Sequence, residues 1–168
     1  MDIFVEKIVA RKKGLKENIL SVVLIVISVI IAFMAAITIG PRGIVVLLVA
    51  GLIFGNWYII SALNVEYEYS ITNGEIDIDK IINKRKRKKM FTAECKDIEV
   101  MAKITSKKYN ESIATVPKKI IAVSSMESPD VYFAMLNIKG KRALIYFEPN
   151  EKMMKTLKGI IPGKIFKD

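Results

Sequence analysis

Side chains able to do chemistry are few in this chain. Its 168 residues include no histidine and a single cysteine, Cys95, so the usual zinc ligand sets and histidine-activated nucleophiles are missing. The acids around that cysteine, Glu94, Asp97 and Glu99, lack the spacing and the glycine of a calcium-binding loop. We therefore expect no catalytic residues, no metal site and no cofactor.

The most conspicuous polar feature is an uninterrupted run of six cations: Lys84, Arg85, Lys86, Arg87, Lys88 and Lys89. Anionic headgroups of an inner membrane leaflet attract such a segment. Nucleic-acid phosphates also attract clustered cations, but the run has no interleaved aromatic residues and no reader motif, which argues against nucleic acid. The simplest alternative is a solvated hairpin tip whose charges prevent pairing with another strand edge. The sequence leaves lipid contact and the solvated tip open.

The elements that must position this run begin with two apolar segments. Residues 19–39 and 44–63 contain no charged side chain. At about 1.5 Å per residue, each is long enough to cross a hydrocarbon core of roughly 30 Å as a helix. Proline and glycine within residues 40–43 favour a sharp external turn between them. The pattern predicts two transmembrane helices, and the lack of acidic residues inside them disfavours an ion or proton transporter.

The flanking charges predict which way this hairpin crosses. Arg11, Lys12 and Lys13 precede the first span, a densely basic segment follows the second, and Arg42 is the only cation in the turn. Because cytoplasmic flanks carry the excess of Lys and Arg, we expect both termini in the cytoplasm. A cleaved signal peptide is the competing interpretation, but the first apolar run exceeds the usual length of roughly 7 to 15 residues and a second span follows at once.

Residues 1–18 form a basic segment next to the membrane. Phe4, Ile8 and Leu15 recur at spacings that fit one face of a helix, with cations between them. The pattern predicts a helix that lies in the membrane interface, where each cation near an anionic leaflet contributes about 1 kcal/mol. A plain flank that sets the topology explains the same residues.

Small residues recur at four-residue steps in both apolar segments. They are Ser28, Ala32 and Ala36 in the first and Gly51 and Gly55 in the second. Such stripes let helix backbones approach closely. We interpret them as the contact between the two helices of one hairpin, in preference to a contact between two copies in a homo-oligomer.

A mostly β domain is predicted for residues 64–168. Val65–Thr72 alternates apolar and polar side chains like a half-buried strand, and Glu75–Ile82 alternates again. Asn73–Gly74 between them is a strong hairpin signal, and the basic run forms the next turn. Five further strands are expected: one near Met90–Phe91, then Ile98–Ile104, Ile120–Ser124, Val131–Ile138 and Lys141–Phe147. Asn150 then caps a C-terminal helix.

The stretch from Tyr67 to Asp79 (YEYSITNGEIDID) and the segment Cys95–Val100 resemble the opening strands of bacterial PH-like (pleckstrin-homology-like) domains. This resemblance implies an α+β fold, a barrel of seven strands closed by a C-terminal helix, and such domains often follow two transmembrane helices. The whole chain is similar to small two-span membrane proteins of clostridia-like Gram-positive bacteria, which implies a place in a bacterial cell membrane. The loop that carries bases in phosphoinositide-binding PH domains is Asn73–Gly74 here, without a base, so no phosphoinositide site is carried over.

These observations favour a non-enzymatic integral membrane protein. Its cytoplasmic PH-like domain is expected to bind a protein partner or the anionic inner leaflet. In the lipid interpretation Lys84–Lys89 and the cations Arg11, Lys12 and Lys13 contact headgroups. The alternative is a subunit of a small membrane enzyme or transporter complex, which would need polar groups that converge on a pocket.

Overall fold

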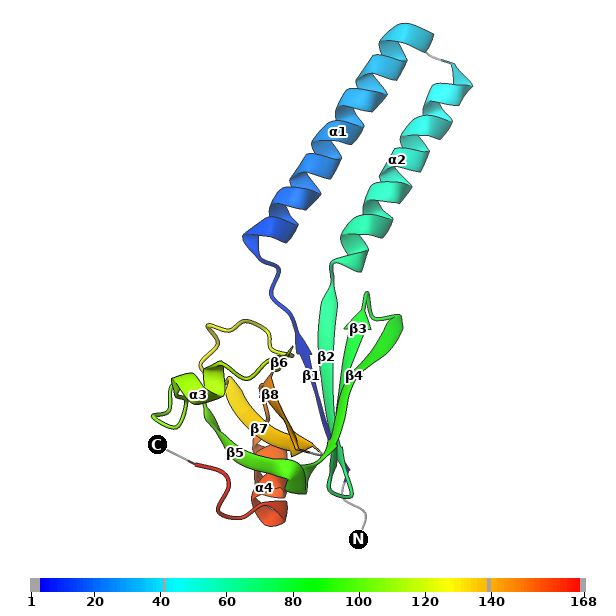
Figure 1. The fold of residues 1–168 in the computed structure, drawn as a ribbon. Helices are drawn as coiled ribbons and strands as arrows, with labels where there is room; N and C mark the ends of the chain where they lie inside the picture. The colour runs from blue at the N-terminus through cyan, green and yellow to red at the C-terminus, as the bar shows by residue number, and fades with distance from the viewer. Residues whose placement is uncertain (1–3, 41, 139, 167–168) are drawn as a thin grey trace. The chain divides into compact units, whose positions relative to one another are not determined.

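A computed structural model describes residues 4–40, 42–138 and 140–166 of the chain. The described chain forms two compact units (Figure 1). One unit contains residues up to 11 together with those from 65 onwards, and the other contains residues 12–64. The helical unit is therefore an insertion between the first and second strands of the β domain, whereas the sequence placed the start of that domain at residue 64.

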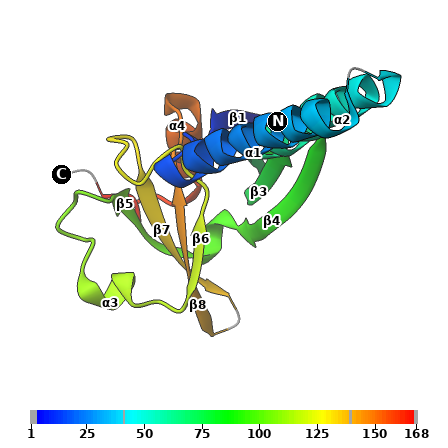
Figure 2. The same cartoon turned by 90° about the horizontal axis from the view of Figure 1, so that it is seen from above.

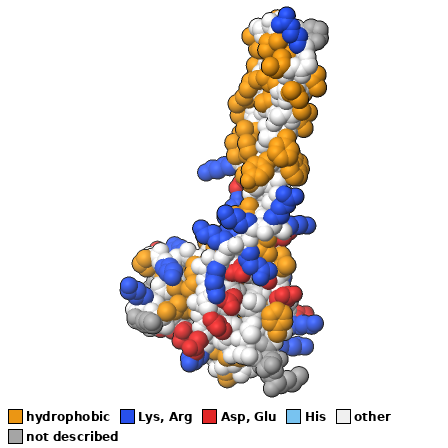
Figure 3. All heavy atoms as spheres, turned by 90° about the vertical axis from the view of Figure 1, so that its right-hand side faces the viewer, with side chains coloured by type: hydrophobic (Ala, Val, Ile, Leu, Met, Phe, Trp, Pro, Cys, Tyr) orange, Lys and Arg blue, Asp and Glu red, His pale blue; other side chains and the backbone are white. Residues whose placement is uncertain are grey.

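The inserted unit consists of two helices, α1 (Leu15–Ile39) and α2 (Gly43–Ala62). α1 has 25 residues and is about 37 Å long at about 1.5 Å per residue, so it begins four residues before the predicted span. It ends at Gly40, whose φ of 73° suits glycine and whose N–H donates to the carbonyl of Ala36 at 3.1 Å. Both helices are long and apolar enough to cross a membrane, and their surface is covered with exposed hydrophobic side chains (Figure 3).

The first sheet of the β domain is antiparallel, in the order β1-β2-β3-β4. Its strands are β1 (Phe4–Ala10), β2 (Val65–Thr72), β3 (Glu75–Ile82) and β4 (Lys86–Glu94). Asn73 and Gly74 join β2 to β3 with φ angles of 48° and 93°. The predicted hairpin is confirmed, because both turn residues take the left-handed conformation that Asn and Gly tolerate best.

The predicted interfacial helix in residues 1–18 is wrong, because Phe4–Ala10 form β1 and pair with β2 from Phe4 opposite Thr72 to Ala10 opposite Glu66. The spacing of four between Phe4 and Ile8 fits a strand as well as a helix, since four is also a multiple of two. Val9, which alternates with Ile8, is buried in the domain core. Pairing with the otherwise open edge of β2 decides between the two structures.

The second sheet has the order β5-β7-β8-β6, with β6 parallel to β8 and the other pairs antiparallel (Figure 2). Its strands are β5 (Ile98–Lys103), β6 (Lys118–Ile121), β7 (Tyr132–Ile138) and β8 (Lys141–Phe147). A 3₁₀ turn (Cys95–Asp97) leads into β5, and a short helix, α3 (Glu111–Ala114), lies between β5 and β6. All seven predicted strands are present. With β1 the described residues form eight strands in two four-stranded sheets, and the expected seven-stranded barrel is not confirmed.

The core of the domain joins both sheets and the last helix, α4 (Glu151–Ile160). Tyr69 from β2 and Phe147 from β8 meet edge to face with ring centroids 5.8 Å apart. The Asn150 side chain accepts a hydrogen bond from the N–H of Met153 at 2.8 Å, which confirms the predicted cap. Met153 and Leu157 are fully buried, so α4 is held by its apolar face.

Candidate functional site

Strand register places the basic run at one particular end of the first sheet. Val65 at the start of β2 pairs with Ile82 at the end of β3, so the turn into β4 lies beside the start of β2. The N–H of Arg11, just after β1, donates to the carbonyl of Val65 at 2.9 Å. We call this the proximal end, because the chain leaves the domain for α1 and returns from α2 here. The Asn73–Gly74 turn is at the opposite, distal end.

The proximal turn, Asn83–Arg85, displays a lysine in a costly backbone conformation. Asn83 and Lys84 have φ angles of 51° and 53°, and the N–H of Arg85 closes the turn on the carbonyl of Ile82 at 3.1 Å. Asn enters this left-handed region readily, whereas for other residues it costs about 1–2 kcal/mol. The Lys84 side chain is 82% exposed, and its Nζ lies 4.0 Å from a carboxylate oxygen of Glu66. The fold therefore tolerates backbone strain at Lys84, and the cation of this residue is exposed at the tip of the turn.

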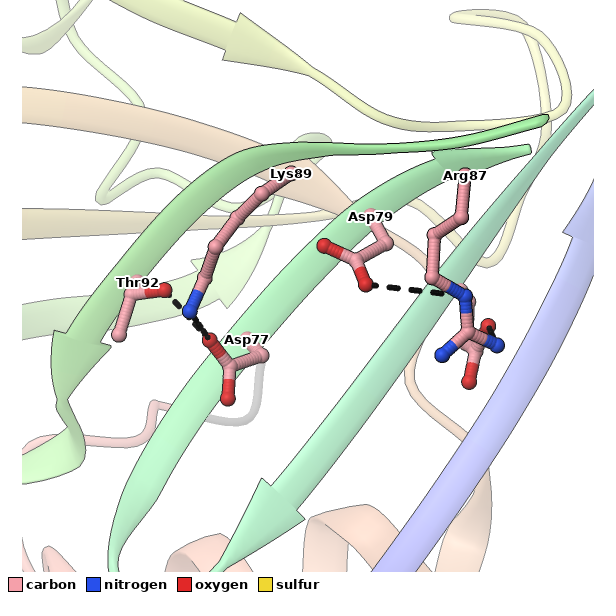
Figure 4. Close-up of polar contacts among 6 residues, drawn as sticks. Asp77, Asp79, Arg87, Lys89 and Thr92 are labelled. Carbon is pink, nitrogen blue, oxygen red and sulfur yellow. Dashed lines mark hydrogen bonds and ion pairs between the residues drawn. The ribbon is translucent and has the colours of Figure 1, made fainter. Parts of the chain in front are cut away.

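The last four cations of the run, from Lys86 onwards, lie in β4, and two of them face acids of the neighbouring strands (Figure 4). We call these acids the acidic ladder: Glu66 and Glu68 in β2, Asp77 and Asp79 in β3. The guanidinium of Arg87 donates to the carboxylate of Glu68, and its Nε lies 3.9 Å from an oxygen of Asp79. Nζ of Lys89 lies 2.9 Å from an oxygen of Asp77. The side chains of Arg87 and Lys89 are 59% and 63% exposed, so the whole run is accessible to solvent, but these two cations are also paired with acids of the sheet.

The hydrogen bonds around Asp77 fix its charge. Burial acts to raise the pKa of this carboxyl, but hydrogen bonds from the Thr92 hydroxyl and the Lys89 ammonium outweigh it, so the pKa lies below its ordinary value. The same pairing raises the pKa of Lys89. One carboxylate oxygen of Asp79 is buried and has no hydrogen-bond partner among the described residues. Asp77 therefore stays anionic at neutral pH and attracts the ammonium of Lys89.

A β-bulge sorts the cations of β4 onto two faces. The register shifts after Ile78, which pairs with Phe91, so that Asp79 pairs with Lys89 and Met90 is left over. Paired residues project to the same face of a sheet, and successive residues to opposite faces. Arg87 and Lys89 therefore share the face of the acidic ladder.

Lys86 and Lys88 pair with Ile82 and Lys80 and project to the other face. Lys86 is exposed at the first position of β4, next to the proximal turn. We call Arg11, Lys84, Arg85 and Lys86 the proximal cluster. Lys12 and Lys13, the other two predicted lipid contacts, are exposed and follow Arg11 directly in the link to α1.

The predicted helix contact is formed by only some of the small residues. Ser28 and Asn56 exchange hydrogen bonds of 2.9 and 3.3 Å between α1 and α2, and Ala32 lines an apolar groove beside them. Ala36 is exposed. A Cβ atom added at Gly51 or Gly55 would meet no other side chain within 4 Å. The hairpin therefore does not use its GxxxG stripe as an internal contact, and the role of that stripe in joining two copies stays a prediction.

Cys95 is fully buried in the main core. Burial raises the pKa of its thiol to about 11, so the thiolate that nucleophilic chemistry needs is scarce at neutral pH. The residue packs the junction between the two sheets, where its N–H donates to the carbonyl of Gly74 at 2.7 Å.

The acidic ladder is the part of this site that the sequence analysis missed. Asp77 and Asp79 were considered as a cation site on one side of a strand, but all four acids were interpreted as the exposed polar positions of two alternating strands. The two-residue turn Asn73–Gly74 fixes the register that brings them together. Glu68 pairs with Asp79 and Ser70 with Asp77. Two like charges directly opposite each other, such as Glu68 and Asp79, repel. This repulsion was the signal in the sequence that cations from a third strand lie beside them.

Comparison with protein families places the chain. The family described as Bacterial PH-like domain (DUF6106) matches residues 1–167, which include β1, the inserted helices and the rest of the β domain. Comparison with curated proteins and with solved structures found no match. The resemblance expected from the first two strands is confirmed over the whole length, and the chain belongs to this family of bacterial PH-like domain proteins.

Proposed function

We propose that this protein is a non-enzymatic integral protein of the bacterial cell membrane that holds its PH-like domain against the anionic inner leaflet. The observation that carries the proposal is the strand register. It places Lys84–Lys86 at the end of the sheet where the chain leaves for the two apolar helices. The basic run is thereby positioned for headgroups, whichever partner the rest of the domain binds.

Short covalent links support this position. Four residues separate β1 from α1 and two separate α2 from β2, and an extended residue spans at most about 3.6 Å. The shorter of the two links keeps the start of β2 within about 11 Å of the end of α2. A polybasic segment that close to the membrane surface is attracted by the negative potential of an anionic leaflet, which decays within about 10 Å of the surface.

The acidic ladder decides which cations contribute. Arg87 and Lys89 are paired with acids of β2 and β3, so their attraction to lipid is reduced. The proximal cluster together with Lys12 and Lys13 supplies six cations at the right end. At about 1 kcal/mol each, they contribute a few kcal/mol to lipid attraction at most, because interactions within the protein, such as that of Lys84 with Glu66, offset part of their charge. The expected lipid is any anionic phospholipid, recognised by charge density.

The alternative, a subunit of a membrane enzyme or transporter complex, needs polar groups that face a pathway. The groove between α1 and α2 is lined by apolar side chains and by the mutually bonded Ser28 and Asn56. Nothing in that groove favours the alternative over a tether.

Two asparagines at opposite ends of β3 provide a matched test. Asn83 and Asn73 lie in turns with nearly equal φ angles, and the eight residues of β3 hold the turns roughly 25 Å apart. We would label Asn83→Cys and Asn73→Cys separately in a Cys95→Ala chain in lipid nanodiscs, with a fluorophore that spin-labelled headgroups quench. We expect strong quenching at position 83 and little at position 73.

Anionic lipid should deepen the quenching at position 83 relative to neutral lipid, because tethering alone is independent of lipid charge. Equal quenching of the two labels in anionic nanodiscs would contradict the docked orientation. Quenching at position 83 that is equal in anionic and neutral nanodiscs would agree with the covalent tether but contradict the electrostatic contact with lipid.

A further inference from the structure

The C-terminal segment of the chain pairs with the free edge of β5 through a single β-bridge. After α4 the chain turns at Gly163, where φ is 85°, and runs parallel to β5 with Ile165 opposite Met101. The N–H of Met101 donates to the carbonyl of Lys164 at 2.9 Å, and the N–H of Phe166 donates to the carbonyl of Met101 at 2.9 Å. Residues 164–166, which we call the tail, thus occupy this edge as a bound peptide would.

The side chains of the tail are held on both faces of the second sheet. Ile165 packs on the main core and Phe166 on the smaller cluster on the other side. The Phe166 ring also lies under the ammonium of Lys108, 4.4 Å from the ring centroid. Nζ of Lys164 donates to the carbonyl of Lys96 at 2.7 Å. The edge therefore selects an order of side chains: a cation, an aliphatic residue and an aromatic residue.

We propose that the free edge of β5 is a binding site for an extended peptide segment of a partner protein, and that the tail is an intramolecular ligand that occupies it. The segment runs parallel to β5 and presents a basic, an aliphatic and an aromatic residue in that order. This site is separate from the proximal cluster, which lies on the first sheet, so it goes beyond lipid docking.

Several features make the tail displaceable. It is attached by the two backbone hydrogen bonds of a single residue, Met101, whereas β7 pairs with β5 from Ile98 to Lys103 on the other edge. Its three side chains are only half-buried. Its pairing is an isolated bridge outside both four-stranded sheets, so it leaves without breaking any strand pair of those sheets.

A competitor peptide can also bind further along the edge of β5 than Met101. Lys103 lies two residues beyond Met101 in β5, so its N–H faces the same edge. In a parallel pairing of this register, the carbonyl at the aromatic position of an incoming strand can accept from that donor. Peptides that add to a sheet edge bind in this way, through main-chain bonds for affinity and alternate side chains for specificity.

A peptide competition experiment tests the proposal. We would compare the full chain with a chain that ends at Gly163, both in nanodiscs, for binding of a fluorescent peptide with the sequence of residues 159–168. We expect saturable binding to the shortened chain and at least tenfold weaker binding to the full chain, where the tail competes. A peptide carrying Ile165→Asp is the matched control and should not bind.

The proposal is overturned if the peptide binds both chains equally, or if it does not bind a shortened chain whose circular dichroism matches that of the full chain. Should the shortened chain unfold, the full chain with Ile165→Ser and Phe166→Ser replaces it, because these changes weaken the tail and keep its backbone.

Hydrogen exchange of the full chain gives an independent measurement. The N–H of Met101 is bonded to the tail, whereas the N–H of Ala102 points to the other side, toward β7. If the tail opens on its own, the amide of Met101 exchanges at least tenfold faster than that of Ala102. Equal protection of these neighbouring amides shows that the tail opens only with the sheet and overturns the proposal.

Discussion

Replacing Lys84 by glycine should separate the stability of the domain from its attraction to lipid. Lys84 occupies the left-handed region with a φ of 53°, which costs a residue with a Cβ about 1–2 kcal/mol. Glycine avoids that cost, but it loses more backbone entropy on folding, which destabilises the variant by about 0.5–1 kcal/mol. The ion pair with Glu66 is 4.0 Å long and made by an 82% exposed lysine, so its loss costs little.

The two effects therefore act in opposite directions. We expect Lys84→Gly to leave the free energy of unfolding unchanged or to raise it by up to about 1 kcal/mol. The same change removes one cation from the proximal cluster, which weakens lipid partitioning by about 1 kcal/mol, or roughly fivefold. If Lys84 served only to stabilise the domain, its replacement by glycine would lower the free energy of unfolding and leave lipid partitioning unchanged.

A soluble form of the domain makes both measurements practical. Arg11 and Val65 are adjacent and hydrogen-bonded, so an Asn-Gly turn can join residues 1–11 to residues 65–168 in place of the two helices. Urea unfolding followed by circular dichroism reports stability. Sedimentation with vesicles of 30% anionic lipid, at low and at physiological salt, reports partitioning.

Asn83→Gly is the matched control, since it relaxes the same turn and removes no charge. It should leave partitioning unchanged. The reasoning is refuted if Lys84→Gly partitions like the parent domain, because the lysine then does not reach the lipid. It is refuted equally if both glycine variants weaken partitioning alike, because the turn geometry is then responsible and the charge is not.

Three further predictions concern the rest of the domain. Residues 64–168 alone lack β1 and the buried Val9, so they should be at least about 3 kcal/mol less stable than the joined domain, or aggregate through the open β2 edge, as urea unfolding and gel filtration would show. Asp77→Asn should destabilise the domain at neutral pH. Because folding lowers the pKa of Asp77, the difference in stability between the variant and the parent should disappear as the pH falls below 3.8, which acid unfolding curves would show. Cys95 should resist iodoacetamide at pH 8 in the folded protein and react once urea unfolds it, because burial raises its thiol pKa to about 11.

Local sequence patterns predicted most of the β domain. Alternation over Val65–Thr72 and Glu75–Ile82 and the Asn73–Gly74 turn fixed two strands and their register, because a two-residue hairpin leaves no freedom in pairing. Asn150 predicted the start of α4 through a cap that needs only neighbouring residues. Each of these features depends on interactions within about ten residues of chain.

Features that depend on distant residues were missed or left open. β1 pairs with a strand more than 50 residues away, and nothing in the spacing of Phe4 and Ile8 distinguishes a strand from a helix. The pairing of Arg87 with Glu68 requires the bulge at Met90, which shifts the face on which each cation lies. The tail pairs with β5 at Met101, and nothing in the sequence of the tail identifies Met101 as its partner.

The insertion of the helices between two paired strands also bears on topology. β1 and β2 are antiparallel neighbours, so the link out to α1 and the link back from α2 start at the same end of one sheet. If the two apolar helices cross a bilayer as we propose, links of four and two residues cannot reach its two faces from one sheet end, since roughly 30 Å of hydrocarbon lies between. The chain must then return to the side from which it left. The short links alone therefore require both termini on one side of the membrane, and the cations at Arg11, Lys12 and Lys13 predict that this side is the cytoplasm. Reporters at the two termini that are found on opposite sides would contradict the constraint set by the links, whereas reporters that are both found outside the cell would contradict only the prediction from charge.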